Sequence, residues 1–226
     1  MLSSIKDLVG CRIQALGGEA GRVRDVYIDD LEWAVVYLVV DTCKWLSDRS
    51  VLILPSAVTS IDWHRRTIAL SLSTMQVELS PDITAHEPVS RRKEARYGPY
   101  AALWTWGTMP VILPLETTTA SNDDAPGQPA EDSADAHLRS SRVVQGYHIR
   151  ASDDSVGHAA DFLFDEETWA IRYLIADTRN WLPGKHVLIS PQRIRDVDWA
   201  DREFRVNLTR RQIERSPEYA AGELRA

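Results

Sequence analysis

The stretch Trp33-Ala-Val-Val-Tyr-Leu-Val-Val-Asp-Thr-Cys-Lys-Trp-Leu-Ser-Asp-Arg-Ser-Val-Leu-Ile-Leu-Pro55 occurs twice in this chain. The second copy is Trp169-Ala-Ile-Arg-Tyr-Leu-Ile-Ala-Asp-Thr-Arg-Asn-Trp-Leu-Pro-Gly-Lys-His-Val-Leu-Ile-Ser-Pro191, in which Trp, Tyr-Leu, Asp-Thr, Trp-Leu, Val-Leu-Ile and Pro recur at identical spacing. The match runs without gaps from residues 8–83 onto residues 144–219, with about a third of the positions identical. A match of that length indicates a duplication.

Each copy has the character of short β-strands. Runs rich in β-branched and aromatic residues predict six strands in the first copy, near residues 11–16, 22–29, 33–42, 51–54, 60–63 and 67–72. Gly21 and Gly157 occupy equivalent positions, as expected where the backbone needs a positive φ. Ser73 and Thr209 each precede a Gln by three positions, and this capping-box spacing predicts a short helix at the end of each copy.

These elements predict a mainly β protein made of two small β-barrels, each with about six short strands and a C-terminal helix, because closure removes exposed strand edges. We expect the two domains at residues 1–85 and 140–220, with residues 86–139 as a linker and residues 221–226 as a tail. Residues 117–136 are rich in Thr, Ser, Asp, Ala and Pro and contain no Lys or Arg. We expect them to be disordered, since they cannot bury enough surface to offset the entropy of ordering.

The charge and the cysteine content of the chain indicate which class of partner it binds and in which cellular compartment it works. A formal net charge of −7 argues against nucleic acid as the main partner, because phosphate binding needs a basic surface. Two cysteines, Cys11 and Cys43, are too few for a disulfide framework. No signal peptide is recognisable, and the longest apolar run is about seven residues, against the roughly 18 that cross a bilayer. We expect a cytoplasmic protein, with a peripheral position at the inner membrane as the open alternative.

Three motifs of the second copy carry a family resemblance. They are the stretch from Asp165-Glu-Glu-Thr-Trp169 to Pro191, Val197-Asp-Trp199, and Leu208-Thr-Arg-Arg-Gln-Ile-Glu-Arg-Ser-Pro-Glu-Tyr219. Together they closely resemble the PRC-barrel family in its bacterial two-copy form. The first copy matches more loosely, since it has Leu54 before Pro55 where the family usually has Ser.

The resemblance implies a small barrel that serves as an assembly module and does not itself carry out catalysis. The family is named for the cytoplasmic barrel of the photosynthetic reaction centre H subunit, and it also occurs in a ribosome maturation factor. The H subunit has an N-terminal membrane helix that is not seen in this sequence, and the maturation factor has a single PRC barrel. Both differences argue against transferring either role directly.

A residue that recurs in both copies is more simply explained by a need of the fold than by a single active site. We expect four pairs of acids to bond local backbone N–H groups at strand ends or turns: Asp25/Asp161, Asp29/Asp165, Asp41/Asp177 and Asp62/Asp198. Further pairs are expected to be structural: Trp33/Trp169, Tyr37/Tyr173, Trp45/Trp181, Pro55/Pro191 and Trp63/Trp199. We expect the three tryptophan pairs in the core or at the contact between the barrels. Ligand stacking on the paired tryptophans is the alternative.

Other aromatic residues lie outside both copies and follow a basic run in the linker. Because aromatic side chains are enriched at interfaces, we expect a candidate interaction surface, which docks on a barrel or on a partner, at Tyr97, Tyr100, Trp104 and Trp106. The six histidines show no spacing typical of metal ligands, although His148 and His158 could approach each other across the first hairpin. No phosphate loop or nucleophile elbow is present. We expect no catalytic residue, no metal and no cofactor.

The leading hypothesis is therefore a non-enzymatic module that binds a protein partner, which is either free or part of a membrane complex. One alternative is a factor that tunes electron transfer or assembly in a photosynthetic reaction centre. Another is a small-molecule-binding protein with a pocket between the barrels. The sequence does not decide the oligomeric state.

Overall fold

The computed structural model describes residues 1–42, 49–84, 137–178, 185–198 and 201–220. We call residues 1–84 the first half and residues 137–220 the second half. The predicted disordered residues 117–136 and the aromatic residues 97–106 lie outside the described residues. None of the helices among the described residues is long and apolar enough to span a bilayer.

The first half consists of short strands with three one-turn helical elements. In chain order these are β1 (Leu2–Ser4), α1 (Ile5–Leu8), β2 (Arg12–Leu16), β3 (Gly18–Asp29), β4 (Ala34–Thr42), β5 (Ser50–Ile53), the 3₁₀ turn η1 (Pro55–Ala57), β6 (Val58–Asp62), β7 (Thr67–Ser73) and α2 (Thr74–Glu78). The six predicted strands are confirmed as β2 to β7, with boundaries shifted by up to four residues.

The second half repeats this order. Its elements are β8 (Leu138–Ser140), α4 (Ser141–Val144), β9 (His148–Arg150), β10 (Ser155–Asp165), β11 (Ile171–Asp177), β12 (His186–Ile189), η4 (Pro191–Arg193), β13 (Ile194–Asp198), β14 (Glu203–Val206) and α5 (Arg210–Glu214). Both predicted capping boxes are confirmed: Ser73 and Thr209 are the N-caps of α2 and α5, and each bonds reciprocally with the Gln at N3.

The strands form two seven-stranded sheets of the same topology. The first sheet has the order β5-β4-β3-β2-β7-β6, and the second has the order β12-β11-β10-β9-β14-β13. The predicted mainly β fold with two similar sheets is thus confirmed. Among the described residues no ladder joins β5 to β6 or β12 to β13, so the structure shows open sheets and closure into barrels stays a prediction.

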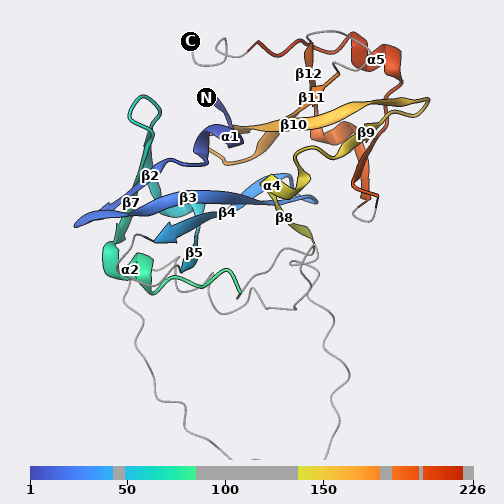
Figure 1. Ribbon diagram of the computed structural model, residues 1–226. Coiled ribbons are helices and arrows are strands. Elements are labelled where there is room, and N and C mark those ends of the chain that lie inside the picture. The colour runs from blue at the N-terminus through green and yellow to red at the C-terminus, as the bar shows by residue number, and fades with distance from the viewer. Residues whose placement is uncertain (43–48, 85–136, 179–184, 199–200, 221–226) are drawn as a thin grey trace, which may run out of the picture.

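The seventh strand of each sheet comes from the opposite half. β1 pairs antiparallel with β10 in the second sheet, and β8 pairs antiparallel with β3 in the first sheet. The pairings are equivalent, since Leu2 lies opposite Asp165 and Leu138 lies opposite Asp29. In Figure 1 the blue N-terminus with α1 lies against β10, and α4 lies against β3. The two halves therefore exchange their first strands, an arrangement that was not predicted from the sequence.

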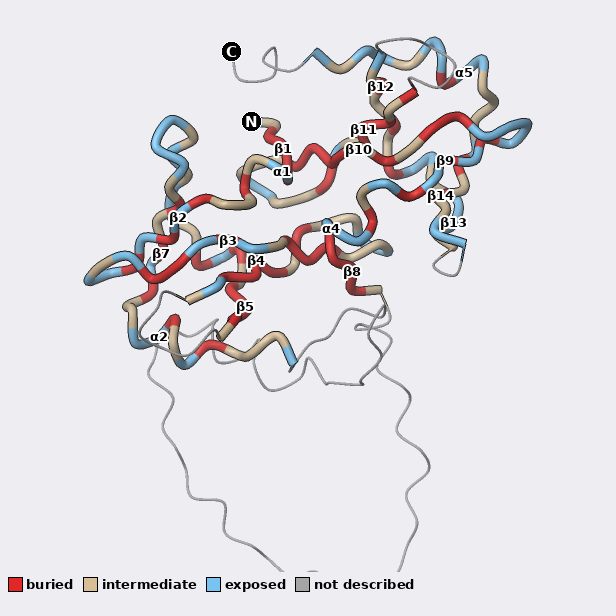
Figure 2. Tube along the Cα trace, viewed as in Figure 1, coloured by how far each residue is buried: buried red, intermediate tan, exposed pale blue. Residues whose placement is uncertain are grey.

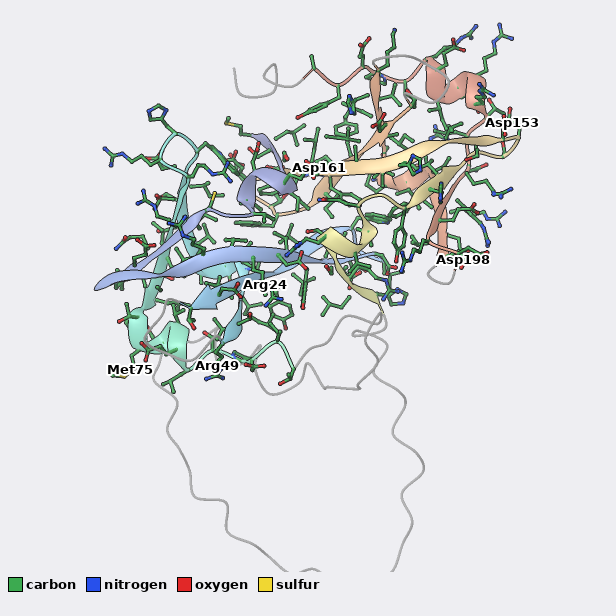
Figure 3. The ribbon with its side chains drawn as sticks, in the orientation of Figure 1. Arg24, Arg49, Met75, Asp153, Asp161 and Asp198 are labelled. Atoms are coloured by element: carbon green, nitrogen blue, oxygen red, sulfur yellow. The ribbon has the colours of Figure 1, made fainter. Side chains whose placement is uncertain are left out.

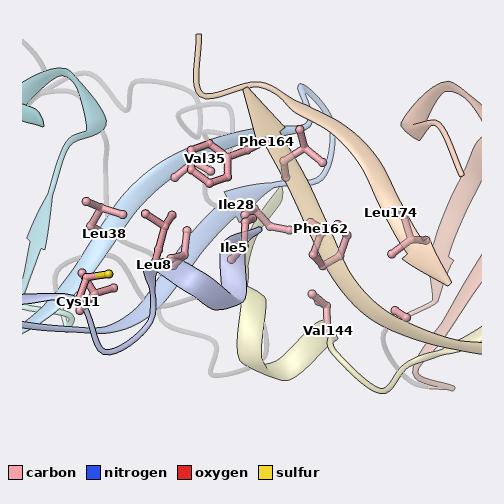
Figure 4. Packing of buried hydrophobic residues seen from close by; sticks show 14 of the residues in the cluster. Ile5, Leu8, Cys11, Ile28, Val35, Leu38, Val144, Phe162, Phe164 and Leu174 are labelled. Atoms are coloured by element: carbon pink, nitrogen blue, oxygen red, sulfur yellow. The ribbon is translucent and has the colours of Figure 1, made fainter. Parts of the chain in front are cut away.

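One hydrophobic core runs through both halves. Its side chains come from most strands of both sheets and from the two exchanged helices. Figure 4 shows Ile5 of α1 and Ile28 of β3 between Phe162 and Phe164 of β10, and all four are at most 1% exposed. Figure 2 shows burial concentrated where the halves meet and exposure at the hairpin tips. Burying one such side chain contributes about 1.5–3 kcal/mol, so the halves stabilise each other.

Gly21 and Gly157 have the positive φ that their recurrence predicted, at 148° and 134°. A Cβ on Gly21 would lie 2.2 Å from the backbone oxygen of Asp41, and one on Gly157 would lie 2.0 Å from that of Asp177. Only glycine allows the neighbouring strand to approach this closely.

Candidate functional site

The two halves meet at a seam, formed by the turns Trp33–Ala34 and Trp169–Ala170 and by the exchanged strands. Ala34 and Ala170 form an antiparallel bridge, in which the Val35 amide donates to the Trp169 carbonyl oxygen at 2.9 Å. The equivalent bond, from the Ile171 amide to the Trp33 oxygen, measures 2.7 Å. Because each contact has its counterpart, the seam has an approximate two-fold axis between the two alanines.

The paired tryptophans Trp33 and Trp169 enter the seam with an uncommon backbone. Their φ values are 51° and 59°, a left-handed conformation that costs a bulky residue about 1–3 kcal/mol. Ring packing offsets this cost: the Trp33 ring lies 6.3 Å from Phe162 of the opposite half, and Trp169 stacks on Phe164 at 5.1 Å. Both rings pack against the shared core, which supports the predicted structural role.

The acids Asp25 and Asp161 anchor the exchanged strands. Ser4 and Ser140 are the N-caps of α1 and α4, and each hydroxyl also donates across the seam: Ser4 to Asp161, and Ser140 to Asp25 at 2.5 Å. The expected location at a strand end or turn is wrong for this pair, since both acids lie inside long strands, next to bulges. The expected bond to a local backbone N–H is confirmed, because the Val26 amide donates to Asp25 and the Phe162 amide donates to Asp161, each at 2.8 Å. Both the location and the bond are confirmed for Asp29, whose carboxylate accepts the Leu31 amide at 2.7 Å.

Asp161 is the more deeply buried of these anchors. Its side chain also accepts the backbone amides of Lys6 at 3.2 Å and Phe162 at 2.8 Å. Burial raises the pKa of Asp161 to about 6, although the hydrogen bonds from Ser4 and the amides counteract it. Figure 3 places Asp161 on β10 where the two halves meet.

Beside these anchors the two halves differ. In the first sheet Asp30 binds Arg139 of β8, with Nε 3.0 Å from Oδ2, and His137 lies 2.7 Å from Oδ1. At the equivalent place in the second sheet, Glu166 accepts the Ser3 hydroxyl at 2.5 Å and the Trp63 indole N–H at 3.0 Å. Burial raises the pKa of Asp30, whereas the Arg139 guanidinium lowers it. Trp63 thus bonds across the seam, as predicted for a contact between the halves.

An open cleft of about 420 Å³ lies beside the seam and is lined by Asp7, Trp63, His64 and Arg66. Its size is within the usual range for a small-molecule site. The equivalents of Asp7 and His64 in the second half are Val143 and Ala200, so these two polar residues belong to the first half alone, whereas Arg66 recurs as Arg202. The Arg66 guanidinium is committed to the Val9 carbonyl oxygen at 2.7 Å.

The other recurring residues that the structure describes take part in packing, hydrogen bonds or turns. Tyr37 is buried in a small cluster with Tyr27 and Leu138, and Tyr173 of β11 is half-buried. The Asp41 carboxylate accepts a hydrogen bond from the Ser50 hydroxyl, and Oδ2 of Asp177 lies 4.0 Å from Nε2 of His186. Asp62 and Asp198 cap the turns that follow them, and Pro55 and Pro191 begin η1 and η4. Several predicted residues lie outside the described residues: Trp45, Tyr97, Tyr100, Trp104, Trp106, Trp181 and Trp199.

His148 and His158 approach each other as predicted. They lie opposite each other on β9 and β10 with ring centroids 4.6 Å apart, and His158 also lies opposite Asp177 of β11. No group of three or more metal-ligating side chains occurs within the part of the chain that the structure describes.

The serine anchors and the Asp30–Arg139 ion pair were not predicted from the sequence. The signal for the serines was present, because Leu2 and Ser4 are repeated as Leu138 and Ser140 with the spacing that relates the two copies. The ion pair gave no such signal, since Arg139 replaces Ser3.

No model of a known protein family matches this chain, and no curated protein matches it either. The resemblance to the PRC-barrel family stays a prediction that rests on the quoted motifs.

Proposed function

We propose that this protein is a non-catalytic interaction module that presents residues 85–136 to a protein partner. The observation that carries the proposal is that the first sheet holds both ends of this segment. Thr84 follows a stretch bonded to β5, and His137 precedes β8, which pairs with β3. The exchange of strands therefore turns two small domains into one platform with a tethered segment.

Both attachment points are fixed by several bonds. At the first, Arg49 donates to the carbonyl oxygens of Glu78 and Ser80 and forms an ion pair with Asp82 at 3.2 Å. At the second, the Asp30 amide donates to the His137 carbonyl oxygen at 3.0 Å, in addition to the side-chain contacts of Asp30. A segment that is anchored at both ends loses less entropy on binding than a free tail does.

Within the segment, Tyr97, Tyr100, Trp104 and Trp106 are the natural contact residues. They have no counterpart in either copy, whereas the described paired residues mainly serve the fold or the seam. Large aromatic side chains also dominate binding energy at protein interfaces. The partner that this composition favours is a protein, alone or in a membrane complex, rather than a nucleic acid, since the chain carries a net charge of −7.

We also propose a barrel architecture for each half. We assign each half to a PRC-type barrel, in which β5 and β6 of the first sheet, and β12 and β13 of the second, curl toward each other around the core. The family expectation of an assembly role and the cytoplasmic location both depend on this assignment. A crystal structure in which the two sheets are flat and packed face to face would remove it.

Affinity capture from a lysate of the source cells tests the proposed function. The bait is the intact chain, compared with the variant Trp104→Ala/Trp106→Ala and with the control Leu31→Ala, which removes an exposed leucine from the seam turn. We expect the tryptophan variant to lose about 90% or more of a specific partner, because a hot-spot residue contributes 2 kcal/mol or more. Equal recovery with all three baits would refute the assignment of this segment.

The cleft supports a second candidate function, the binding of a small charged molecule. Asp7 and His64 lie at its wall and are absent from the equivalent place in the second half. A ligand that binds only the folded state raises the melting temperature, so a thermal-shift screen of metabolites tests this candidate. A genuine ligand should lose its effect on the variant His64→Ala; an unchanged shift in that variant would exclude the cleft.

A further inference from the structure

The outer face of α2 carries apolar side chains that are exposed. Leu16, Met75 and Leu79 are 62%, 64% and 70% exposed, and we call them the α2 patch. Leu79 lies one helical turn after Met75 and donates its amide to the Met75 carbonyl oxygen at 3.0 Å. Leu16 pairs with Ser73, the N-cap of the same helix. Figure 3 shows Met75 on the outer side of α2.

The same place in the second half is polar. The equivalents of Leu16, Met75 and Leu79 are Ser152, Arg211 and Arg215, and all three are exposed. The fold therefore does not need apolar side chains here, because α5 forms with the same capping box and the same buried face without them. Exposed apolar side chains that the fold does not use indicate a contact surface.

We propose that residues 97–106 of this chain dock on the α2 patch. The chain leaves α2 and is described up to Thr84, and the 12 residues 85–96 can span about 40 Å at about 3.3 Å each, which is enough to return to the helix. The segment has Tyr97, Tyr100, Trp104 and Trp106, which are aromatic side chains suited to an apolar surface. Like the patch, these side chains have no equivalent in the other copy.

Charge complementarity supports the same occupant. The acids Glu19 and Glu78 lie near the patch residues along the chain, Glu19 on β3 three positions after Leu16 and Glu78 on α2 directly before Leu79. The aromatic residues of the segment directly follow a basic run, which consists of Arg91, Arg92, Lys93 and Arg96. Opposite charges that flank an apolar contact favour one orientation of the docked segment. The aromatic residues occupy the α2 patch in the isolated chain, and a protein partner would compete with the patch for them.

Methyl NMR of the intact chain with ¹³C-labelled methionine tests this inference. We expect the Met75 methyl resonance to lie upfield of its free position, because indole rings shield a methyl group that packs on their face. The variant Trp104→Ala/Trp106→Ala should return it to the free position. A Met75 resonance that is already at the free position and unmoved in this variant would overturn the inference.

Amide hydrogen exchange provides a second readout from the other side of the contact. The variant Leu16→Ser/Met75→Gln/Leu79→Gln makes the patch polar, as it is in the second half. We expect exchange in residues 97–106 to become about tenfold faster or more, since a docked segment is protected by its opening free energy. The control Arg211→Ala/Arg215→Ala, at the equivalent positions, should leave this exchange unchanged.

The same experiments identify other occupants of the α2 patch. If a second copy covered it, the Met75 shift would depend on protein concentration and the mass in solution would double, which would overturn docking within the chain. If the triple variant left the exchange of residues 97–106 unchanged while its circular dichroism stayed native, docking would likewise be refuted.

Discussion

The variant Asp161→Asn should make the stability of this protein less dependent on pH. Asp161 is buried at the seam and bonds only donors: the Ser4 hydroxyl and the backbone amides of Lys6 and Phe162. Burial nevertheless raises its pKa from 3.8 to about 6. Between these values the folded protein binds more protons than the unfolded chain, so its free energy of unfolding falls as the pH rises.

The magnitude follows from the two pKa values of Asp161. Because one pKa unit corresponds to about 1.4 kcal/mol, an increase from 3.8 to about 6 makes the folded state about 3 kcal/mol less stable at pH 7.5 than below pH 3.8. An asparagine can keep part of the hydrogen bonding without a charge. The wild type should therefore lose about 2–3 kcal/mol relative to Asp161→Asn when the pH rises from 4 to 7.5.

Urea unfolding followed by tryptophan fluorescence, at intervals between pH 3.5 and 7.5, measures this difference. The matched control is Asp165→Asn on the same strand. The backbone amide of Glu167 lowers the pKa of Asp165, so its contribution should be present above pH 5 and be lost on acidification below about pH 4. A difference between wild type and Asp161→Asn that stays constant across the range would refute the account of the buried carboxyl.

Three further perturbations test the close strand contact, the buried ion pair and the exchange. Gly157→Ala places a Cβ 2.0 Å from the carbonyl oxygen of Asp177 and should cost about 3 kcal/mol or more, whereas Gly18→Ala, with open space around it, should cost about 1 kcal/mol in urea unfolding. Arg139→Met leaves the Asp30 carboxylate buried without its main partner and should cost about 3–5 kcal/mol, most of which the double variant with Asp30→Leu should recover. Proteolytic cleavage between the halves should leave a complex that still elutes as one species in size-exclusion chromatography, because each half supplies a strand to the other's sheet; two separate peaks would contradict the exchange.

Local patterns predicted the parts of this structure that local interactions determine. The six strands of each half and the boxes at Ser73 and Thr209 depend on neighbours within a few residues, and the sequence shows them directly. The recurrence of Gly21 and Gly157 likewise predicted a backbone constraint that the structure explains by a strand contact.

Local sequence patterns could not predict the exchanged strands, for a physical reason. A strand of three residues, such as Leu2–Ser4, is too short to show a period of two, and its partner edge is chosen by tertiary contacts. The role of Asp25 and Asp161 depends on the same exchange, because their serine donors lie more than 100 residues away along the chain. The duplication contained the missing information, since Ser4 and Ser140 recur at the spacing that relates the copies.

We propose that the binding surfaces of this molecule lie among the positions that differ between the copies. Recurring positions such as Gly21, Gly157, Ser4 and Ser140 maintain two sheets that complete each other, so changing one of them damages the platform. The α2 patch, Asp7 and His64 of the cleft, and the aromatic residues of the linker each occur in one copy or outside both. After a duplication, such positions are free to acquire a contact that a symmetric pair of domains could not make. An asymmetric binding surface on a nearly symmetric scaffold is therefore the arrangement that this sequence favours.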